Sequence, residues 1–390
     1  MIARLLLAAL LFLPCAADAG EPKPTGSPSA PGYQPIGRDE QGLWAEADEN
    51  ERELKVSKLV IREPSVNAYL RRVLCREIGD AACASVRLYL LRIPISNANM
   101  APNGVLQIYS GLLLRMRDEA ELAAILGHEF THFENRHSLA DMRKKRSATS
   151  WGAWLTVASF ATDRPHNFMP DFLAGYFSYS RNQEREADLG GLQRMSVAGY
   201  RPMAASNIWM HMREEKDAQA HALGVKSLKD ADYGPFASHP MDVERMTYLA
   251  REGQALTKPG AEFDGLDEYR AALAPIWPML IDDQIKLNDF GGSEYVLENL
   301  ARGNWTGPLL YARGELHRAR GGIADQLTAE ALYRQAIVRP DAPPATWRGL
   351  GLVLLRNGRP DEGRAMLRSY LERAPDAADR AVLQALADGI

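Results

Sequence analysis

The sequence has 390 residues, of which 46% are hydrophobic and 25% are charged, and these values are typical of a water-soluble globular protein. The length is sufficient for two or three domains with separate cores. There are 46 Lys and Arg residues against 50 Asp and Glu residues, so the net charge is −4. This balance excludes nucleic acid as the main partner and excludes a polybasic membrane-surface protein, because both kinds of binding need an excess of positive charge.

The N-terminus has the pattern of a secretory signal peptide over residues 1–19. Arg4 supplies a positive charge, residues 5–13 form an unbroken apolar run, and Ala17 and Ala19 form an A-x-A cleavage site. A short membrane anchor is the weaker alternative, because this run is too short for a hydrocarbon core about 30 Å thick. Residues 20–37 are rich in Pro, Gly and Ser and are predicted to be a flexible leader. We therefore expect an exported protein, with no transmembrane segment in the mature chain.

Two helices are predicted next, the first from about residue 39 past residue 54 and the second over 66–78. Cleavage of the signal peptide would leave two cysteines, Cys75 and Cys83, where the second helix turns into a strand. Two cysteines eight positions apart in an exported chain favour a disulfide. The alternative is that both are small buried hydrophobic side chains.

A small antiparallel sheet is predicted after the cysteines. Residues 85–93 have the β-branched and aromatic content of a strand, and residues 105–109 are predicted to form a second strand. The turn signal Pro102-Asn103-Gly104 lies between them, and Asn-Gly favours tight hairpins.

A long helix is predicted over residues 118–146, and it contains the string H-E-F-T-H at 128–132. His128 and His132 are four residues apart, so both imidazoles project from one face, which suits two ligands of a tetrahedral zinc. Glu129 lies about 100° round the helix from His128, where it can take a proton from metal-bound water. A random H-E-x-x-H is expected in about one such chain in a hundred, so two solvated histidines are the weaker explanation.

A catalytic zinc also needs a third protein ligand. His137 does not occupy the third-ligand position of the H-E-x-x-H-x-x-G-x-x-H pattern, where this chain has Ser138. On a continuous helix it lies about 140° from His132, and it is therefore predicted to be structural.

A further helix is predicted over residues 182–198, with Gly199 as its stop signal. Glu184 and Asp188 share one face of this helix, whereas Glu186 lies about 200° from Glu184. We predict that Glu184 is the third ligand and that Asp188 holds a ligand histidine by its other ring nitrogen. A solvated acidic helix face is the alternative.

The character of the chain changes near residue 253, and residues 308–387 are predicted to form helical hairpins. The tetratricopeptide spacing is matched by Trp347, Leu350, Gly351, Leu354, Gly363, Leu367 and Pro375. A plain helical tail is the alternative. Fewer than three clear repeats are present, so the array is expected to depend on the catalytic domain for stability.

With these motifs the chain resembles the zinc metallopeptidase family that includes HtpX and the CAAX prenyl proteases, over about residues 59–248. The shared motifs are N-A at 97–98, P-N-G at 102–104, L-G-H-E-x-x-H at 126–132 followed by R-H, S-R-x-x-E-x-E-A-D at 180–188, and S-H-P at 238–240 with Arg245. The expected fold class is therefore α+β and mainly helical: a zincin-like metallopeptidase domain with a small β-sheet at 38–252, then an all-α tetratricopeptide-like domain at 253–390.

The resemblance implies one Zn²⁺ per chain and a role for each matching residue. The expected metal ligands are His128, His132 and Glu184. Glu129 would be the general base, and Asp188 is sometimes assigned as a proton donor. His239 and Arg245 would lie near the metal, where His239 either caps the zinc in the resting enzyme or stabilises the transition state.

We expect an exported zinc endopeptidase of the periplasm, soluble or peripherally membrane-associated, that hydrolyses unfolded or misassembled envelope proteins. The strand at 105–109 is expected to pair with the substrate backbone as an added strand. The repeats are expected to dock clients or the outer-membrane protein assembly machinery. The alternative is a chaperone or adaptor whose zinc site is capped and weakly active. A non-peptide hydrolase shares the zinc chemistry and is excluded only by the resemblance.

Overall fold

The computed structural model describes residues 25–148, 179–227, 243–258, 260 and 263–390. Over these residues the protein is mainly helical with one small sheet, which confirms the predicted fold class. The described helices up to residue 223 are α1 (Gly37–Val56), α2 (Pro64–Ile78), α3 (Asp80–Cys83), α4 (Ser110–Arg115), α5 (Glu119–Glu134), α6 (His137–Ala148), α9 (Arg181–Ala198) and α10 (Ala204–Leu223). The helices that follow are α11 (Val243–Leu256), α12 (Leu266–Leu273), α13 (Trp277–Lys286), α14 (Phe290–Ala301), α15 (Gly307–Arg320), α16 (Ile323–Ile337), α17 (Ala345–Arg356), α18 (Pro360–Arg373) and α19 (Arg380–Asp388).

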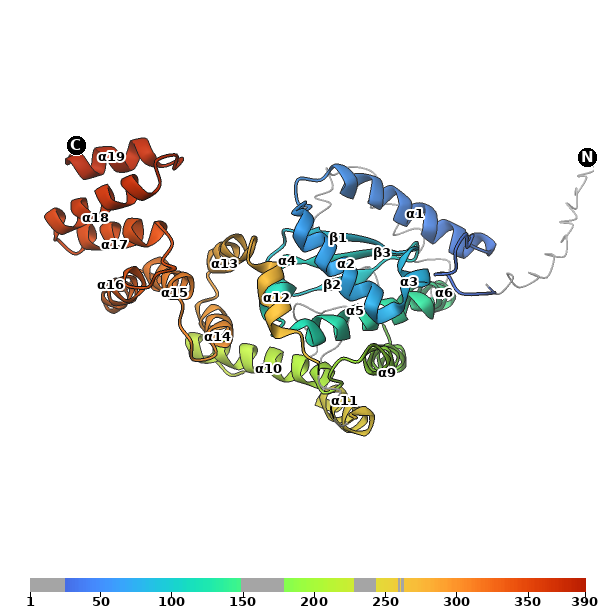
Figure 1. The fold of residues 1–390 in the computed structure, drawn as a ribbon. Coiled ribbons are helices and arrows are strands. Elements are labelled where there is room, and N and C mark those ends of the chain that lie inside the picture. The colour runs from blue at the N-terminus through green and yellow to red at the C-terminus, as the bar shows by residue number, and fades with distance from the viewer. Residues whose placement is uncertain (1–24, 149–178, 228–242, 259, 261–262) are drawn as a thin grey trace, which may run out of the picture.

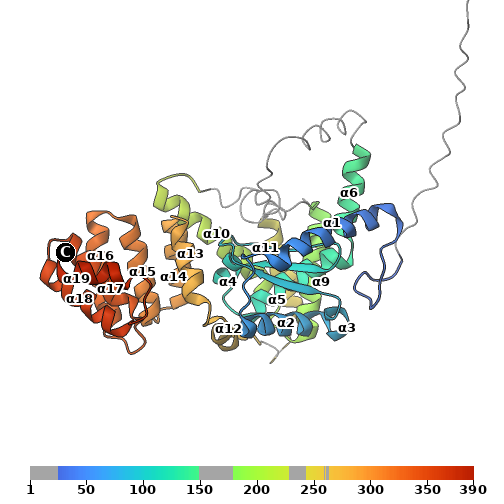
Figure 2. The same ribbon diagram turned by 90° about the horizontal axis from the view of Figure 1, so that it is seen from above.

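The molecule is elongated. Helices α1 to α6 and α9 to α12 lie around the sheet at one end of the molecule. Helices α13 and α14 follow, and α15 to α19 extend away from the sheet toward the C-terminus (Figures 1 and 2). None of the described helices combines the length and the apolar character needed to cross a membrane. The predicted signal peptide lies outside the described residues.

The sheet is mixed, and this corrects the predicted antiparallel pairing. In the described residues it has the order β1 (Arg87–Leu91), β3 (Val105–Tyr109), β2 (Ala98–Met100). β1 pairs with β3 in parallel, and β2 pairs with β3 antiparallel. The Pro-Asn-Gly turn does close a hairpin, but its first strand is β2, which the sequence analysis missed because three residues show no alternation. β3 is therefore the central strand, with a partner on each side, and it cannot accept a substrate strand as predicted.

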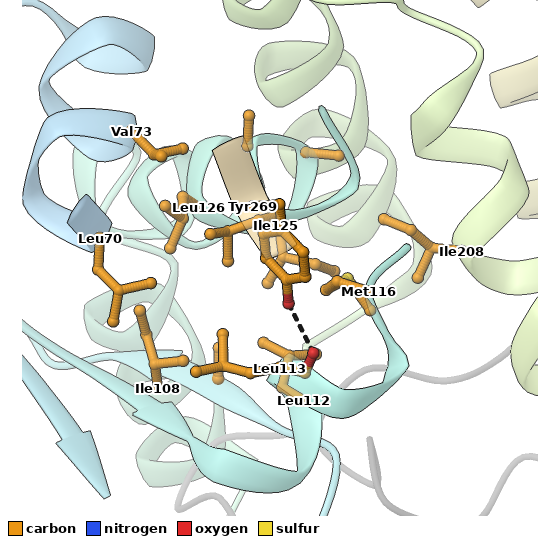
Figure 3. Close-up of a cluster of buried hydrophobic side chains, with 14 of the residues drawn as sticks. Leu70, Val73, Ile108, Leu112, Leu113, Met116, Ile125, Leu126, Ile208 and Tyr269 are labelled. Carbon is orange, nitrogen blue, oxygen red and sulfur yellow. Dashed lines mark hydrogen bonds between the residues drawn. The ribbon is translucent and has the colours of Figure 1, made fainter. Parts of the chain in front are cut away.

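The core lies between the sheet and the helices that cover it. Leu70 and Val73 of α2 and Leu126 of α5 pack in one buried cluster with Ile108 of β3 (Figure 3). Tyr269 of α12 enters the same cluster, and its hydroxyl donates a hydrogen bond to the Leu113 carbonyl at 2.6 Å.

This cluster continues through buried residues of α13, α14 and α15. The division predicted at residue 253 therefore falls inside one continuous core. Helices α12 to α15 therefore bury part of their apolar faces against the peptidase domain.

The C-terminal helices form hairpins that need small residues where they cross. A Cβ on Gly314 or Gly349 would lie 2.6 to 2.7 Å from the Tyr333 ring, and a Cβ on Gly351 would lie 2.9 Å from the Gly363 carbonyl. Each position therefore requires glycine, because real Cβ atoms do not approach so closely. Separate apolar clusters fill these hairpins, the first around Tyr333 and the next around Leu367.

Part of the predicted flexible leader is held against the peptidase domain. The Ser29 hydroxyl donates to the Glu134 carboxylate at 2.8 Å, and the Arg136 guanidinium donates to the Gly26 carbonyl at 2.9 Å. The Tyr33 ring also packs against Trp44 of α1. Composition alone could not show these contacts, because their partners lie far away in the sequence.

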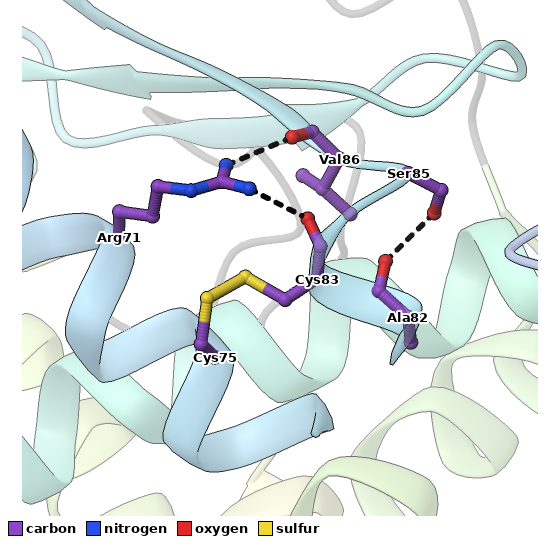
Figure 4. Close-up of a disulfide and its surroundings, with 6 residues drawn as sticks. All are labelled: Arg71, Cys75, Ala82, Cys83, Ser85 and Val86. Carbon is purple, nitrogen blue, oxygen red and sulfur yellow. Dashed lines mark hydrogen bonds between the residues drawn. A yellow bond between two sulfur atoms is a disulfide. The ribbon is translucent and has the colours of Figure 1, made fainter. Parts of the chain in front are cut away.

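A disulfide joins Cys75 at the end of α2 to Cys83 of α3, with 5.1 Å between the two Cα atoms (Figure 4). Arg71 strengthens the same corner, because its guanidinium donates to the carbonyls of Cys83 and Val86. The bond thus ties the end of α2 to the chain that enters β1.

We expect the double substitution Cys75→Ala/Cys83→Ala to lower the free energy of unfolding by about 2 to 3 kcal/mol, the value for closing so short a loop. Urea unfolding of the oxidised protein and the variant measures the difference, and reductant should lower the stability of the oxidised protein only. Titration of the mature, unreduced, denatured protein should find no free thiol. Two free thiols would contradict the disulfide.

Candidate metal centre

The H-E-x-x-H string lies in α5, the central helix of the peptidase domain. Asp118 caps its N-terminus by accepting a hydrogen bond from the Glu121 N–H at 2.9 Å. Residues 119–133 are all buried, as expected for a helix enclosed on every side. The predicted helix 118–146 is in fact two helices, because Arg136 adopts a left-handed conformation with φ of 52° between α5 and α6.

The second half of the site lies on α9, which begins and ends as predicted. Ser180 and Gln183 form a capping box at its start, and Gly199 adopts a left-handed conformation at its end. α9 crosses α5 closely, since a Cβ on Gly191 would lie 2.8 Å from the His128 backbone nitrogen and 3.1 Å from the Gly127 carbonyl carbon. The close approach places Glu184 opposite the two histidines.

We expect Gly191→Ala to force α5 and α9 apart and to lower the free energy of unfolding by about 1 to 3 kcal/mol, the usual cost of overpacking. Metal affinity should fall with it, because the donors come from both helices. Gly42→Ala is the matched control, since a Cβ there meets nothing within 4 Å and alanine favours the helix. Thermal unfolding and metal titration of both variants measure the effect. Equal stability of the two would contradict the close crossing.

Three buried side chains converge at the crossing: His128, His132 and Glu184. The two histidine Nε2 atoms are 3.1 Å apart. The Glu184 carboxylate lies 3.6 Å from His128 Nε2 and 3.5 Å from His132 Nε2. Donors of a tetrahedral zinc at 2.0 to 2.1 Å are separated by roughly 3.3 to 3.4 Å. The spacing and the donor chemistry therefore fit a small divalent metal ion.

A charged network holds two of these ligands. His128 Nδ1 lies 2.9 Å from the Asp188 carboxylate. Arg245 of α11 is buried and bridges both acids, at 2.6 Å from Glu184 and 2.7 Å from Asp188, and its guanidinium also lies over the Trp209 ring. The Tyr248 hydroxyl donates to Asp188. Burial would raise the pKa of Asp188, but the Arg245 guanidinium and His128 hold it well below its usual value.

His132 is enclosed by two groups to which the sequence analysis gave no role at the metal. The Tyr179 ring stacks on the His132 ring with 3.9 Å between centroids. His137 Nδ1 lies 2.8 Å from His132 Nδ1, and His137 Nε2 lies 3.2 Å from Glu186 Oε2. Burial lowers the pKa of His137, while Glu186 opposes that effect. No signal in the sequence indicated Tyr179, because its contact with His132 joins residues far apart in the chain.

The structure therefore brings together five residues that the sequence analysis singled out: His128, His132, Glu184, Asp188 and Arg245. Glu129 is buried on α5 beside His128. His137 is not among the three donors, but it contacts His132, which is one of them. The predicted angle of 140° between the two side chains does not apply, because the helix breaks at Arg136. His239 lies outside the described residues.

A histidine pair on one helix and a glutamate on the helix that crosses it, with a second glutamate beside the first histidine, define the class of metallopeptidases. Within that class, residues 60–252 match the model of peptidase family M48, and this domain is a metallopeptidase of that family. Residues 344–388 match the tetratricopeptide repeat, which confirms the predicted repeat character of this region.

Curated relatives agree with this assignment. The chain is 33% identical over 215 residues to the mitochondrial metalloendopeptidase OMA1 of Schizosaccharomyces pombe, covering 54% of this chain and 58% of that protein. It is 26% identical over 175 residues to a putative beta-barrel assembly-enhancing protease of Vibrio cholerae, covering 42% and 36%. It is 26% identical over 202 residues to the beta-barrel assembly-enhancing protease of Escherichia coli, covering 49% and 41%. The chain thus spans between about a third and three fifths of these relatives.

Proposed function

We propose that this protein is an exported, zinc-dependent endopeptidase that cleaves unfolded or misassembled proteins of the cell envelope. The observation that carries the proposal is the buried group His128, His132 and Glu184, with Glu129 beside it on the same helix. Two imidazoles and one carboxylate are a usual donor set of catalytic zinc, which keeps its fourth position for water or substrate.

Zinc, when bound, lowers the pKa of its water to about 7 and polarises the scissile carbonyl. Glu129 acts as general base, taking the proton of the attacking water and passing it to the leaving amine. Asp188 orients His128 through the 2.9 Å contact with Nδ1. Arg245 holds Glu184 and Asp188 in place and compensates their charge.

The substrate edge in this proposal is β2 and not β3. The edge of β1 is partly covered, because the Ile61 N–H donates to the Leu90 carbonyl at 2.8 Å. β2 lies at the other edge of the sheet and packs against α5 (Figure 1). The neighbours Asn97 and Ala101 bond to β3, so Ala98 and Met100 direct their backbone groups away from β3, to the side where no described strand pairs with β2. An extended peptide added there would be bound mainly through its backbone and less through its side chains, which suits unfolded clients.

Three observations support an envelope location and a role in protein assembly. The N-terminal pattern is that of a signal peptide, the Cys75–Cys83 disulfide fits an oxidising compartment, and two relatives carry the name beta-barrel assembly-enhancing protease. The tetratricopeptide region supplies a surface for clients or for the assembly machinery. That same region also favours a second function, in which the protein binds clients as a chaperone or adaptor and cleaves slowly.

The test is cleavage of unfolded casein by the purified mature protein. We expect one zinc per chain, loss of cleavage after treatment with a chelator, and recovery when zinc is restored. A protein that binds zinc and casein but does not cleave would support the chaperone or adaptor instead. A protein that binds no zinc would overturn both the metal site and the proposed activity.

A further inference from the structure

The two ligand histidines are held by different kinds of partner. His128 contacts the Asp188 carboxylate, whereas His132 contacts another histidine. His137 Nδ1 is 2.8 Å from His132 Nδ1, and on its other side His137 Nε2 is 3.2 Å from the carboxylate of Glu186. Neither His137 nor Glu186 belongs to the donor group, so their contacts need another explanation.

The chemistry of imidazole sets the direction of these hydrogen bonds. His132 directs Nε2 toward the other donors, so its Nδ1 carries the hydrogen and donates. His137 Nδ1 must then accept, because two N–H groups cannot bond to each other. An imidazole that accepts at Nδ1 carries its hydrogen on Nε2, and from there it donates to Glu186. His132 therefore donates to His137, and His137 in turn donates to Glu186.

We propose that His137 and Glu186 are positioning residues that fix the ring of His132 and so tighten metal binding. The proposal rests on the metal site of the proposed function. It adds a second set of hydrogen bonds to a ligand histidine, beside the contact of His128 with Asp188. Partners that hold the far nitrogen of a ligand histidine fix its orientation and raise its basicity, and their loss usually weakens metal binding 10- to 100-fold.

The fold maintains this contact by an unusual backbone conformation. A left-handed Arg136 turns the chain back after α5, so that His137 at the start of α6 faces His132. The Arg136 guanidinium donates to the Glu40 carboxylate and to the Tyr33 hydroxyl, each at 2.8 Å, and this holds the strained residue.

Because Glu186 is exposed, its substitution can distinguish an effect on the orientation of His132 from an effect on core packing. His137 is 3% exposed, so removing it also alters the core, whereas the Glu186 side chain is 61% exposed and its removal leaves the core intact. An effect of Glu186 on metal affinity would therefore pass through His137.

The experiment measures the zinc dissociation constant by competition with a chromophoric chelator, without any peptidase assay. His137→Phe keeps an aromatic ring but removes both nitrogens, and we expect it to weaken binding 10- to 100-fold. Glu186→Ala should weaken binding about 3- to 10-fold, less than the loss of the direct partner. His137→Gln offers both an acceptor and a donor and should recover part of the loss. The visible spectrum of the cobalt-substituted protein should change with His137→Phe, because the ring of His132 is released.

The double variant gives the decisive comparison. Glu186→Ala should have no effect in the His137→Phe background, since its link to the metal is already lost. Glu252→Ala, which removes another partly exposed carboxylate, should leave zinc affinity unchanged. The proposed hydrogen bonds from His132 through His137 to Glu186 would be overturned by either of two results: wild-type zinc affinity in His137→Phe, or an equal effect of Glu186→Ala in both backgrounds. Absence of zinc binding by the wild-type protein would instead refute the proposed function.

Discussion

Glu129→Gln is expected to reduce kcat/KM for an unfolded substrate by about 100- to 10,000-fold while the protein keeps one zinc per chain. The substitution leaves all three donors in place and removes only the group that accepts the proton of water. Zinc content measured together with casein cleavage checks both parts of this prediction.

Glu134→Gln is the matched control for the general base, because it makes the same change on the same helix. Glu134 lies at the end of α5 and contacts Ser29 of the N-terminal segment. Near-normal cleavage is expected. If Glu129→Gln retains full activity, Glu129 is not the base, and if it loses zinc, the variant says nothing specific about proton transfer and Glu129 supports the metal instead.

Arg245→Met is expected to lower the free energy of unfolding of the metal-free protein by about 3 to 5 kcal/mol. Arg245 is 4% exposed and lies between Glu184 and Asp188, so its loss removes a buried cation from two buried carboxylates. Methionine fills a similar volume, which limits the contribution of a cavity. Zinc should restore part of the lost stability, because the metal ion supplies positive charge at the same place. Urea unfolding with a chelator and with zinc measures both values.

Arg251→Met is the control for Arg245, since it removes an arginine from the same helix. The Arg251 side chain is 68% exposed and pairs with the neighbouring Glu252. A change within about 0.5 kcal/mol is expected for such a surface site. A similarly small change for Arg245→Met would show that the buried network contributes little to folding.

The donor group was predictable from sequence because its geometry is local. In a helix, residues four apart share a face, and this rule alone pairs His128 with His132 and Glu184 with Asp188. The cap at Ser180 and the stop at Gly199 are equally local, and α9 has the bounds that they indicate. The class of protein follows from these few residues, since their types are those that a catalytic metal requires.

The surroundings of the donors depended on contacts between distant parts of the chain. The prediction for the sheet was wrong because β2 is too short to show a pattern. β2 is the antiparallel partner of β3 that residues 85–93 were expected to be, and β1 pairs with the other side of β3 in parallel. The boundary at residue 253 was drawn from a change in composition, whereas Tyr269 places α12 in the core of the peptidase domain.

His137 shows the difference most clearly. On a continuous helix, His137 would lie about 140° from His132 and would face away from it. This would hold if α5 continued through residue 137. Arg136 breaks the helix, and its guanidinium is held by Glu40 and Gly26, which are 96 and 110 residues away in sequence. By itself the sequence determined which residues can bind the metal, because helical spacing is a property of neighbours. The tertiary structure decided which residues hold those ligands, because a left-handed arginine is stable only where distant partners compensate its strain.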